Sequence, residues 1–212
     1  MVSGVSWSPD GKSLAVTRTN FETLTNELLL LDADSGEQQS LVSGSGTIGA
    51  PRWSPDGTSV TFESAVPEQR NKLFLYALGS GAPAAIPMSI DGPSSPDWSP
   101  AGRTIVFVAP HESGPAQLFT VSPDGGEPVQ ISTSITDKAY PRWSLDGSRV
   151  AYVGTVPERL ASRKPAALHN VAVFTVKADG TNETAFTDLA LDAWFIGWCA
   201  PGPWLNKGWQ RE

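Results

Sequence analysis

The sequence predicts an all-β fold, a β-propeller of four full four-stranded antiparallel blades followed by a degenerate, incomplete fifth. Three observations lead to this prediction. A tryptophan-led turn recurs at nearly constant spacing, and a second β-rich segment follows each turn in the same register. No segment shows the long 3.6-residue apolar period of an amphipathic helix. Four short strands in roughly 45 residues, repeated around an aromatic anchor, are typical of propeller blades.

Each repeat opens with an inner strand that ends at a tryptophan, and a tight turn follows. The four copies read Trp7-Ser8-Pro9-Asp10-Gly11, Trp53-Ser54-Pro55-Asp56-Gly57, Trp98-Ser99-Pro100-Ala101-Gly102 and Trp143-Ser144-Leu145-Asp146-Gly147, with the tryptophans 46, 45 and 45 residues apart. Proline fixes φ at the first corner, aspartate can bond back to the backbone, and glycine tolerates positive φ. These residues therefore have a structural role, in which each tryptophan fills the space between neighbouring sheets.

Three further strands complete each repeat. The second follows the turn, as in Ser59–Phe62 and Thr104–Phe107. The third is predicted at Leu28–Leu31, Leu73–Tyr76, Leu118–Val121 and Val173–Val176, and the weaker fourth at Gln39–Val42, Ala84–Met88, Val129–Ile131 and Thr184–Phe186. This alignment gives one propeller with blades at about residues 1–46, 47–91, 92–136 and 137–190.

The fifth copy is eroded. It reads Trp198-Cys199-Ala200-Pro201-Gly202 and begins 55 residues after Trp143, because an insertion of ten residues lies in the loop 154–170. The partial blade 191–212 also gathers four of the eight tryptophans, Trp194, Trp198, Trp204 and Trp209. A six-bladed ring needs about 270 residues at this period. We therefore expect either that further blades are missing or that the arc associates through its open ends.

The Trp-Ser-Pro-Asp-Gly signature, with its downstream third strand and Asp-Gly turn, resembles the TolB-like propeller repeat. The resemblance covers residues 1–187 well and the remaining residues poorly. It implies a propeller of the kind found in periplasmic translocation proteins and in the propeller domains of prolyl oligopeptidases. Ala101 and Leu145 depart from the pattern and weaken their turns. Because the signature residues shape a turn, they indicate fold rather than function.

Composition excludes several classes of function. The net charge of -7 argues against a nucleic-acid partner, which requires a basic surface. No apolar run approaches the roughly 20 residues of a membrane-spanning helix. Cys199 is the only cysteine, which rules out an intrachain disulfide and a multi-cysteine metal site. The first ten residues show no signal peptide, so only the family resemblance favours a periplasmic or other extracytoplasmic location.

Two groups of residues are candidates for binding. Arg52, Asp97 and Arg142 each follow a proline and precede the anchor tryptophan, so they either project at the mouth of the central channel or form ion pairs between blades. His111 and His169, with Arg159, fall in loops between second and third strands, either as a weak metal or anion site or as exposed loop residues. We expect no resident metal, cofactor or catalytic residue, because neither Gly-x-Ser-x-Gly nor His-Glu-x-x-His occurs.

Three functions follow from this pattern. The first is a non-enzymatic scaffold that binds a protein or peptide through one loop face, formed by Thr19–Asn26, Ala65–Asn71, Ala109–Ala116 and Thr155–Asn170. The second is the gating propeller of a prolyl-oligopeptidase-type serine peptidase whose hydrolase domain lies elsewhere. The third is a propeller lyase or sugar-binding enzyme that uses His111 and His169. We favour the scaffold.

Overall fold

The computed structural model describes residues 1–65, 69–111, 114–155 and 171–186 of the chain. These residues form strands, turns and bends, and no helix among them could cross a membrane. The predicted partial fifth blade, with its four tryptophans, lies outside the described residues.

The strands form four separate sheets, each an antiparallel meander of four strands that are consecutive in the sequence. The sheets are β1 (Val2–Trp7), β2 (Ser13–Asn20), β3 (Thr25–Asp32) and β4 (Gln38–Gly44); β5 (Thr47–Trp53), β6 (Ser59–Ala65), β7 (Lys72–Ala77) and β8 (Ala84–Ala85); β9 (Ser94–Trp98), β10 (Ile105–His111), β11 (Gly114–Val121) and β12 (Val129–Gln130); and β13 (Lys138–Trp143), β14 (Arg149–Thr155), β15 (Val171–Lys177) and β16 (Thr184–Ala185). We call them blades 1 to 4. The prediction of an all-β partial propeller is confirmed.

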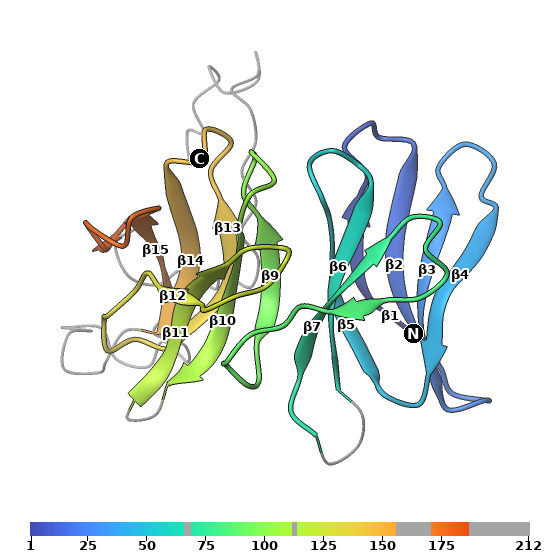
Figure 1. Cartoon of the computed structure of the whole chain (residues 1–212), viewed down its shortest axis with the longest axis horizontal. Coiled ribbons are helices and arrows are strands. Elements are labelled where there is room, and N and C mark those ends of the chain that lie inside the picture. The colour runs from blue at the N-terminus through green and yellow to red at the C-terminus, as the bar shows by residue number, and fades with distance from the viewer. Residues whose placement is uncertain (66–68, 112–113, 156–170, 187–212) are drawn as a thin grey trace, which may run out of the picture.

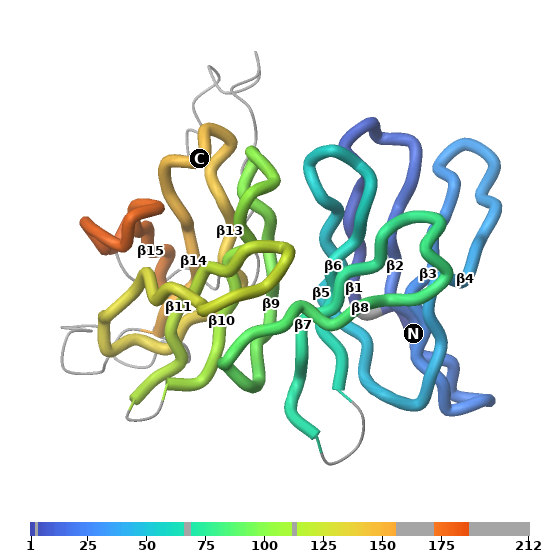
Figure 2. Tube along the Cα trace, viewed as in Figure 1, coloured from blue at the N-terminus to red at the C-terminus, as the bar shows by residue number. Residues whose placement is uncertain are grey.

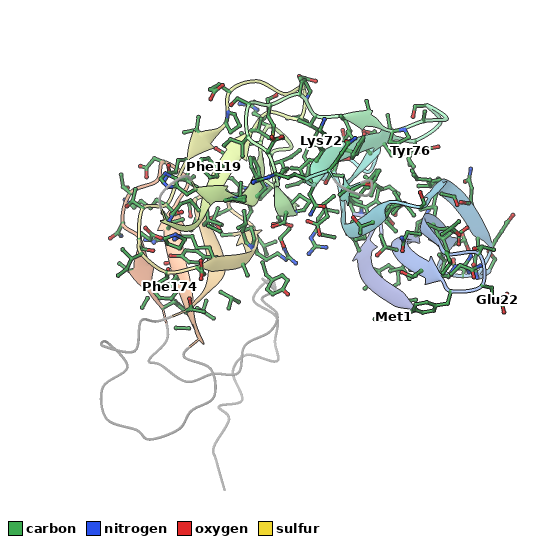
Figure 3. The ribbon with its side chains drawn as sticks, turned by 90° about the horizontal axis from the view of Figure 1, so that it is seen from below. Met1, Glu22, Lys72, Tyr76, Phe119 and Phe174 are labelled. Carbon is green, nitrogen blue, oxygen red and sulfur yellow. The ribbon has the colours of Figure 1, made fainter. Side chains whose placement is uncertain are left out.

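Successive blades lie side by side in chain order, as the colour gradient of Figure 2 shows. The first strand of each blade contacts the first strand of the next, so β1, β5, β9 and β13 form the inner wall of an arc. Figure 3 shows this arc from below, with blade 1 at the end marked by Met1 and Glu22 and blade 4 at the end marked by Phe174. The described sheets do not close into a ring.

The turn after each tryptophan is closed by a network of short hydrogen bonds, seen clearly in blade 2. The Ser54 hydroxyl donates to Asp56 Oδ1 (2.6 Å) and accepts from the amide of Ser59 (3.0 Å). Asp56 Oδ1 also accepts from the amide of Thr58 (3.0 Å). Gly57 takes a φ of 72°, which a side chain would strain. Every partner lies within five residues, so this turn forms from local sequence alone.

Blades 1 and 4 repeat this network around Asp10 and Asp146. Blade 3 has Ala101 at that position and keeps only the bond from the Thr104 amide to the Ser99 hydroxyl (3.1 Å). The hydrogen bonds from Ser144 and Ser148 lower the pKa of Asp146 to about 2. The turn aspartates are therefore ionised hydrogen-bond acceptors and are not suited to act as general acids.

The hydrophobic core is divided into three layers, one between each pair of neighbouring blades. The layer between blades 2 and 3 contains Leu73 and Ile86 from blade 2 and Trp98, Phe107 and Phe119 from blade 3. Phe107 stacks on Phe119 at 5.9 Å between ring centroids. The corresponding pairs are Phe62 with Phe74 and Tyr152 with Phe174. Trp53, Trp98 and Trp143 thus pack against the blade that precedes their own.

Trp7 does not follow the predicted burial. Trp53, Trp98 and Trp143 are 8–9% exposed, whereas Trp7 is 58% exposed. The reason is positional, because no described blade precedes blade 1. Val5, two residues earlier on the same face of β1, is 54% exposed. The expectation that every anchor tryptophan fills a gap between sheets is therefore wrong for Trp7, and this end of the arc presents an apolar sheet face.

The three buried indoles also differ in how their N–H groups are satisfied. Trp98 Nε1 donates to Thr61 Oγ1 (3.0 Å), which belongs to the preceding blade. Strand pairing shows that Ala15 and Val106 hold the position of Thr61 in blades 1 and 3. Neither side chain has an acceptor, and the indole N–H groups of Trp53 and Trp143 have no partner among the described residues.

This difference predicts a large loss of stability for one isosteric substitution and a small one for the reverse substitution. Thr61→Val should lower the free energy of unfolding by about 1–3 kcal/mol, because it leaves the buried Trp98 N–H without an acceptor. Val106→Thr should cost less than about 0.5 kcal/mol, because the new hydroxyl can accept from Trp143 Nε1.

Urea denaturation followed by circular dichroism measures both effects. Val121→Thr is the matched control for Val106→Thr, since Val121 is 3% exposed and packs in the layer of Trp98, whose N–H already has its acceptor. We expect this control to lose about 1–3 kcal/mol. Equal losses for Val106→Thr and Val121→Thr would show that the hydroxyl does not reach the indole.

Candidate ligand-binding site

The inner strands share an irregularity just before the anchor tryptophan. Ala50, Ser95 and Tyr140 have φ angles of 47°, 53° and 53°, and each directly precedes a proline. Pairing with the second strand shifts register at this point in blades 2, 3 and 4. Such a conformation costs about 1–3 kcal/mol per residue in a side-chain-bearing position. A bulge of this kind turns side chains away from the regular ladder, here toward the inner wall.

A cavity of about 580 Å³ lies where these irregular strands converge. Its wall is drawn from all four blades and combines apolar side chains (Val2, Val5, Ile48, Tyr140) with charged ones (Arg52, Glu63, Arg142). Two residues that line the cavity, Val2 and Thr47, pair with Arg18 and Ala65 near the ends of β2 and β6. The cavity therefore lies toward the loops that connect the second strands to the third strands. The N-terminal amine donates to Thr19 O (2.8 Å) at this end.

Asp97 joins three blades next to Arg52 of the cavity wall. Arg52 of blade 2 pairs with Asp97 of blade 3, with 3.5 Å between Nε and Oδ1. The other oxygen of Asp97 accepts from the amide of Trp143 in blade 4 (2.8 Å). In blade 1, Ser6 holds the position of Asp97, and its hydroxyl accepts from the amide of Trp53 (3.4 Å). The residue before the tryptophan thus links one blade to the next.

Burial shifts the protonation of these groups. It raises the pKa of Asp97 to about 7, although the Trp143 amide and Arg52 both favour the ionised form. Burial also raises the pKa of Glu63. The Ser95 amide, which donates to Glu63 Oε2 (2.8 Å), and the charge of Arg52 both act in the opposite direction. The pKa of Arg52 is lowered by burial. Burial therefore favours the neutral form of both carboxyl groups.

The structure brings some of the candidate residues together and leaves others apart. Arg52 and Arg142 line the cavity, and Asp97 pairs with Arg52. Arg142 is 8% exposed and donates from Nη1 to Pro141 O (2.7 Å). His111 is exposed at the end of β10. Arg159 and His169 lie outside the described residues.

Glu63 and Tyr140 were missed by sequence reasoning. Tyr140 precedes Pro141 in the same motif as Arg142, so the motif could have identified it. Glu63 has no such signal, because Thr17, Val108 and Val153 hold its position in the other blades. Among the described residues, no group of three or more His, Cys, Asp or Glu side chains could hold a metal ion.

The family model for the TolB beta propeller domain matches residues 2–189. The chain belongs to the TolB β-propeller family. This confirms the resemblance read from the tryptophan-led repeats. A search of curated protein sequences gives no significant match.

Solved structures show the same fold. TolB from Acinetobacter baumannii superposes with a TM-score of 0.72 at 22% identity, covering 91% of this chain and 45% of that one. A TolB-type protein from Agrobacterium tumefaciens gives a TM-score of 0.68 at 26% identity, covering 84% and 62%. A puromycin-hydrolysing peptidase from Mycobacterium tuberculosis gives 0.63 at 16% identity, covering 88% and 29%. The chain therefore spans less than two thirds of each of these proteins.

Proposed function

We propose that this TolB-family propeller is a non-enzymatic binding scaffold that takes a peptide segment of a partner protein into the cavity on its inner wall. The observation that supports this most is the convergence of the irregular inner strands on one cavity. Strained backbone is retained where function requires it, and here it recurs in blades 2, 3 and 4 at the cavity wall.

The composition of the wall suits a peptide. The exposed parts of Val2, Val5 and Tyr140 offer apolar area, and Arg52 and Glu63 offer one charge of each sign. Tyrosine and arginine dominate the binding energy of many protein interfaces. The predicted binding loops follow β2 and β6 near the end of the cavity, so a partner that inserts a segment there would also meet loop 21–24.

Selection of random linear peptides displayed on phage, with the 212-residue chain immobilised, tests the proposal. We expect selected peptides to lose at least about tenfold in affinity on Tyr140→Ala. Leu145→Ala is the matched control, because Leu145 is 58% exposed in the turn at the opposite end of β13 and should leave affinity unchanged. Peptides that bind the wild type and Tyr140→Ala equally would contradict the cavity as the site.

A second candidate function uses the same cavity as part of a peptidase. The fold likeness to the puromycin-hydrolysing peptidase supports a gating propeller of a prolyl-oligopeptidase-type serine peptidase. In that case the cavity would admit peptide substrates to a hydrolase domain outside these residues. A Gly-x-Ser-x-Gly elbow encoded in frame beside them would favour this function over the scaffold.

The cellular location is part of the same proposal. Family membership favours a periplasmic or other extracytoplasmic compartment. Fractionation of cells that express the native gene tests this, and recovery of the protein with cytoplasmic markers would contradict it.

A further inference from the structure

The outermost strand of blade 1 differs from its counterparts. β4 runs for seven residues, Gln38–Gly44, whereas β8, β12 and β16 have two residues each. It is the last strand of its sheet among the described residues, and Figure 1 shows it at the rim of the arc. One side of its backbone therefore offers N–H and C=O groups along a long edge.

Two of the other outer edges carry prolines, which cannot donate to an added strand. Pro83 and Pro87 flank β8, and Pro128 precedes β12. Prolines, charges and short strands are the means by which natural sheets prevent edge pairing. The β4 sequence Gln-Gln-Ser-Leu-Val-Ser-Gly contains neither a proline nor a charge. Blade 1 thus lacks these protections at its outer edge.

A bulge in β4 determines how this edge could pair. Ser40 and Val42 pair with the consecutive residues Leu29 and Leu28, which leaves Leu41 as the extra residue. Ser40 and Ser43 pair with Leu29 and Glu27, two positions apart on β3. Because side chains alternate along β3, Ser40 and Ser43 lie on the same face of the sheet although they are three residues apart.

We propose that β4 pairs antiparallel with β4 of a second copy, with Ser40 opposite Ser43 and Leu41 opposite Val42. This is the register about a two-fold axis that keeps each opposed pair on one face of the sheet. The uncharged sequence supports a second copy as the partner, because no like charges meet when the strand pairs with itself. Leu41 and Val42 pack partly against the layer between blades 1 and 2, so the joined edge continues that apolar layer. This interface is separate from the peptide cavity.

Two double variants test the register. In Ser40→Lys/Ser43→Lys, two lysine pairs oppose each other across the interface, whereas in Ser40→Lys/Ser43→Glu each lysine meets a glutamate. Both serines are exposed, and circular dichroism checks that both variants fold, since residue 43 also pairs with Glu27 of β3. Sedimentation equilibrium at low ionic strength should give dimers for the wild type and the Lys/Glu variant. The Lys/Lys variant should associate at least about tenfold more weakly than the Lys/Glu variant.

A third variant separates this edge from the apolar face beside Trp7. Trp7→Glu should leave the dimer intact, because Trp7 belongs to the inner strand. A wild type that stays monomeric at every concentration would overturn the proposal. The β4 edge would then be available to a strand from another protein. Equal association of the Lys/Lys and Lys/Glu variants, or loss of the dimer in Trp7→Glu, would overturn it as well.

Discussion

Trp98→Ala is expected to lower the free energy of unfolding of the 212-residue chain by about 3–5 kcal/mol, the usual cost of truncating a large buried aromatic residue. Trp98 is 9% exposed and packs with Leu73 and Phe107 in the layer between blades 2 and 3. The substitution removes this apolar contact and the hydrogen bond from its indole to Thr61. This layer holds blades 2 and 3 together. We therefore expect blades 1 and 2 to unfold less cooperatively with blades 3 and 4 in the variant.

The same substitution at the equivalent position of blade 1 provides the control. Trp7 is 58% exposed, so Trp7→Ala should change the free energy of unfolding by less than about 1 kcal/mol. Urea denaturation followed by circular dichroism compares the two, since each variant loses one tryptophan and is fitted to its own folded and unfolded baselines. Equal losses at the two positions would mean that the face carrying Trp7 is covered in solution as fully as that of Trp98.

The contrast between these tryptophans shows what the sequence could predict. The turn after each tryptophan depends on contacts within five residues, such as those of Asp56 with Ser54 and Thr58. Local contacts of this kind are visible in a repeat, and the four-stranded meanders follow from them. The burial of an anchor depends on whether another blade precedes it. Trp7 and Trp53 both begin the sequence Trp-Ser-Pro-Asp-Gly, yet only Trp53 is buried, so the arrangement of blades distinguishes them.

The candidate site shows the same limit. The motif before each tryptophan identified Arg52, Asp97 and Arg142 as a set, but it left open whether they face a channel or pair between blades. The structure places Arg52 in both settings, since it lines the cavity and pairs with Asp97. Glu63 carries no signal because its position is not acidic in the other blades. Its role depends on its contact with Ser95 of the next blade, which no local pattern encodes.

The buried position of Asp97 predicts a pH dependence of stability. Its pKa rises from an ordinary value of 3.8 to about 7 in the folded chain, chiefly through burial. The folded state therefore holds its proton more tightly than the unfolded state. The resulting stabilisation is complete below about pH 4 and is lost as the pH rises toward 7. We expect the free energy of unfolding to fall across this window, by up to about 1.4 kcal/mol per pH unit where the difference in bound protons is largest.

Asp97→Asn should remove most of this slope, because asparagine cannot ionise yet can still accept from the Trp143 amide. Glu63 has a raised pKa of the same sign, so a smaller residual slope should remain in the variant. Asp146→Asn is the matched control. Its carboxyl has a pKa lowered to about 2, so its contribution is lost only as the pH falls below about 4 and its removal should leave the pH 4–7 profile unchanged. Urea denaturation at successive pH values gives the three profiles. Parallel profiles for wild type and Asp97→Asn between pH 4 and 7 would show that the bridge between Arg52 and Trp143 holds an ordinary ionised carboxylate.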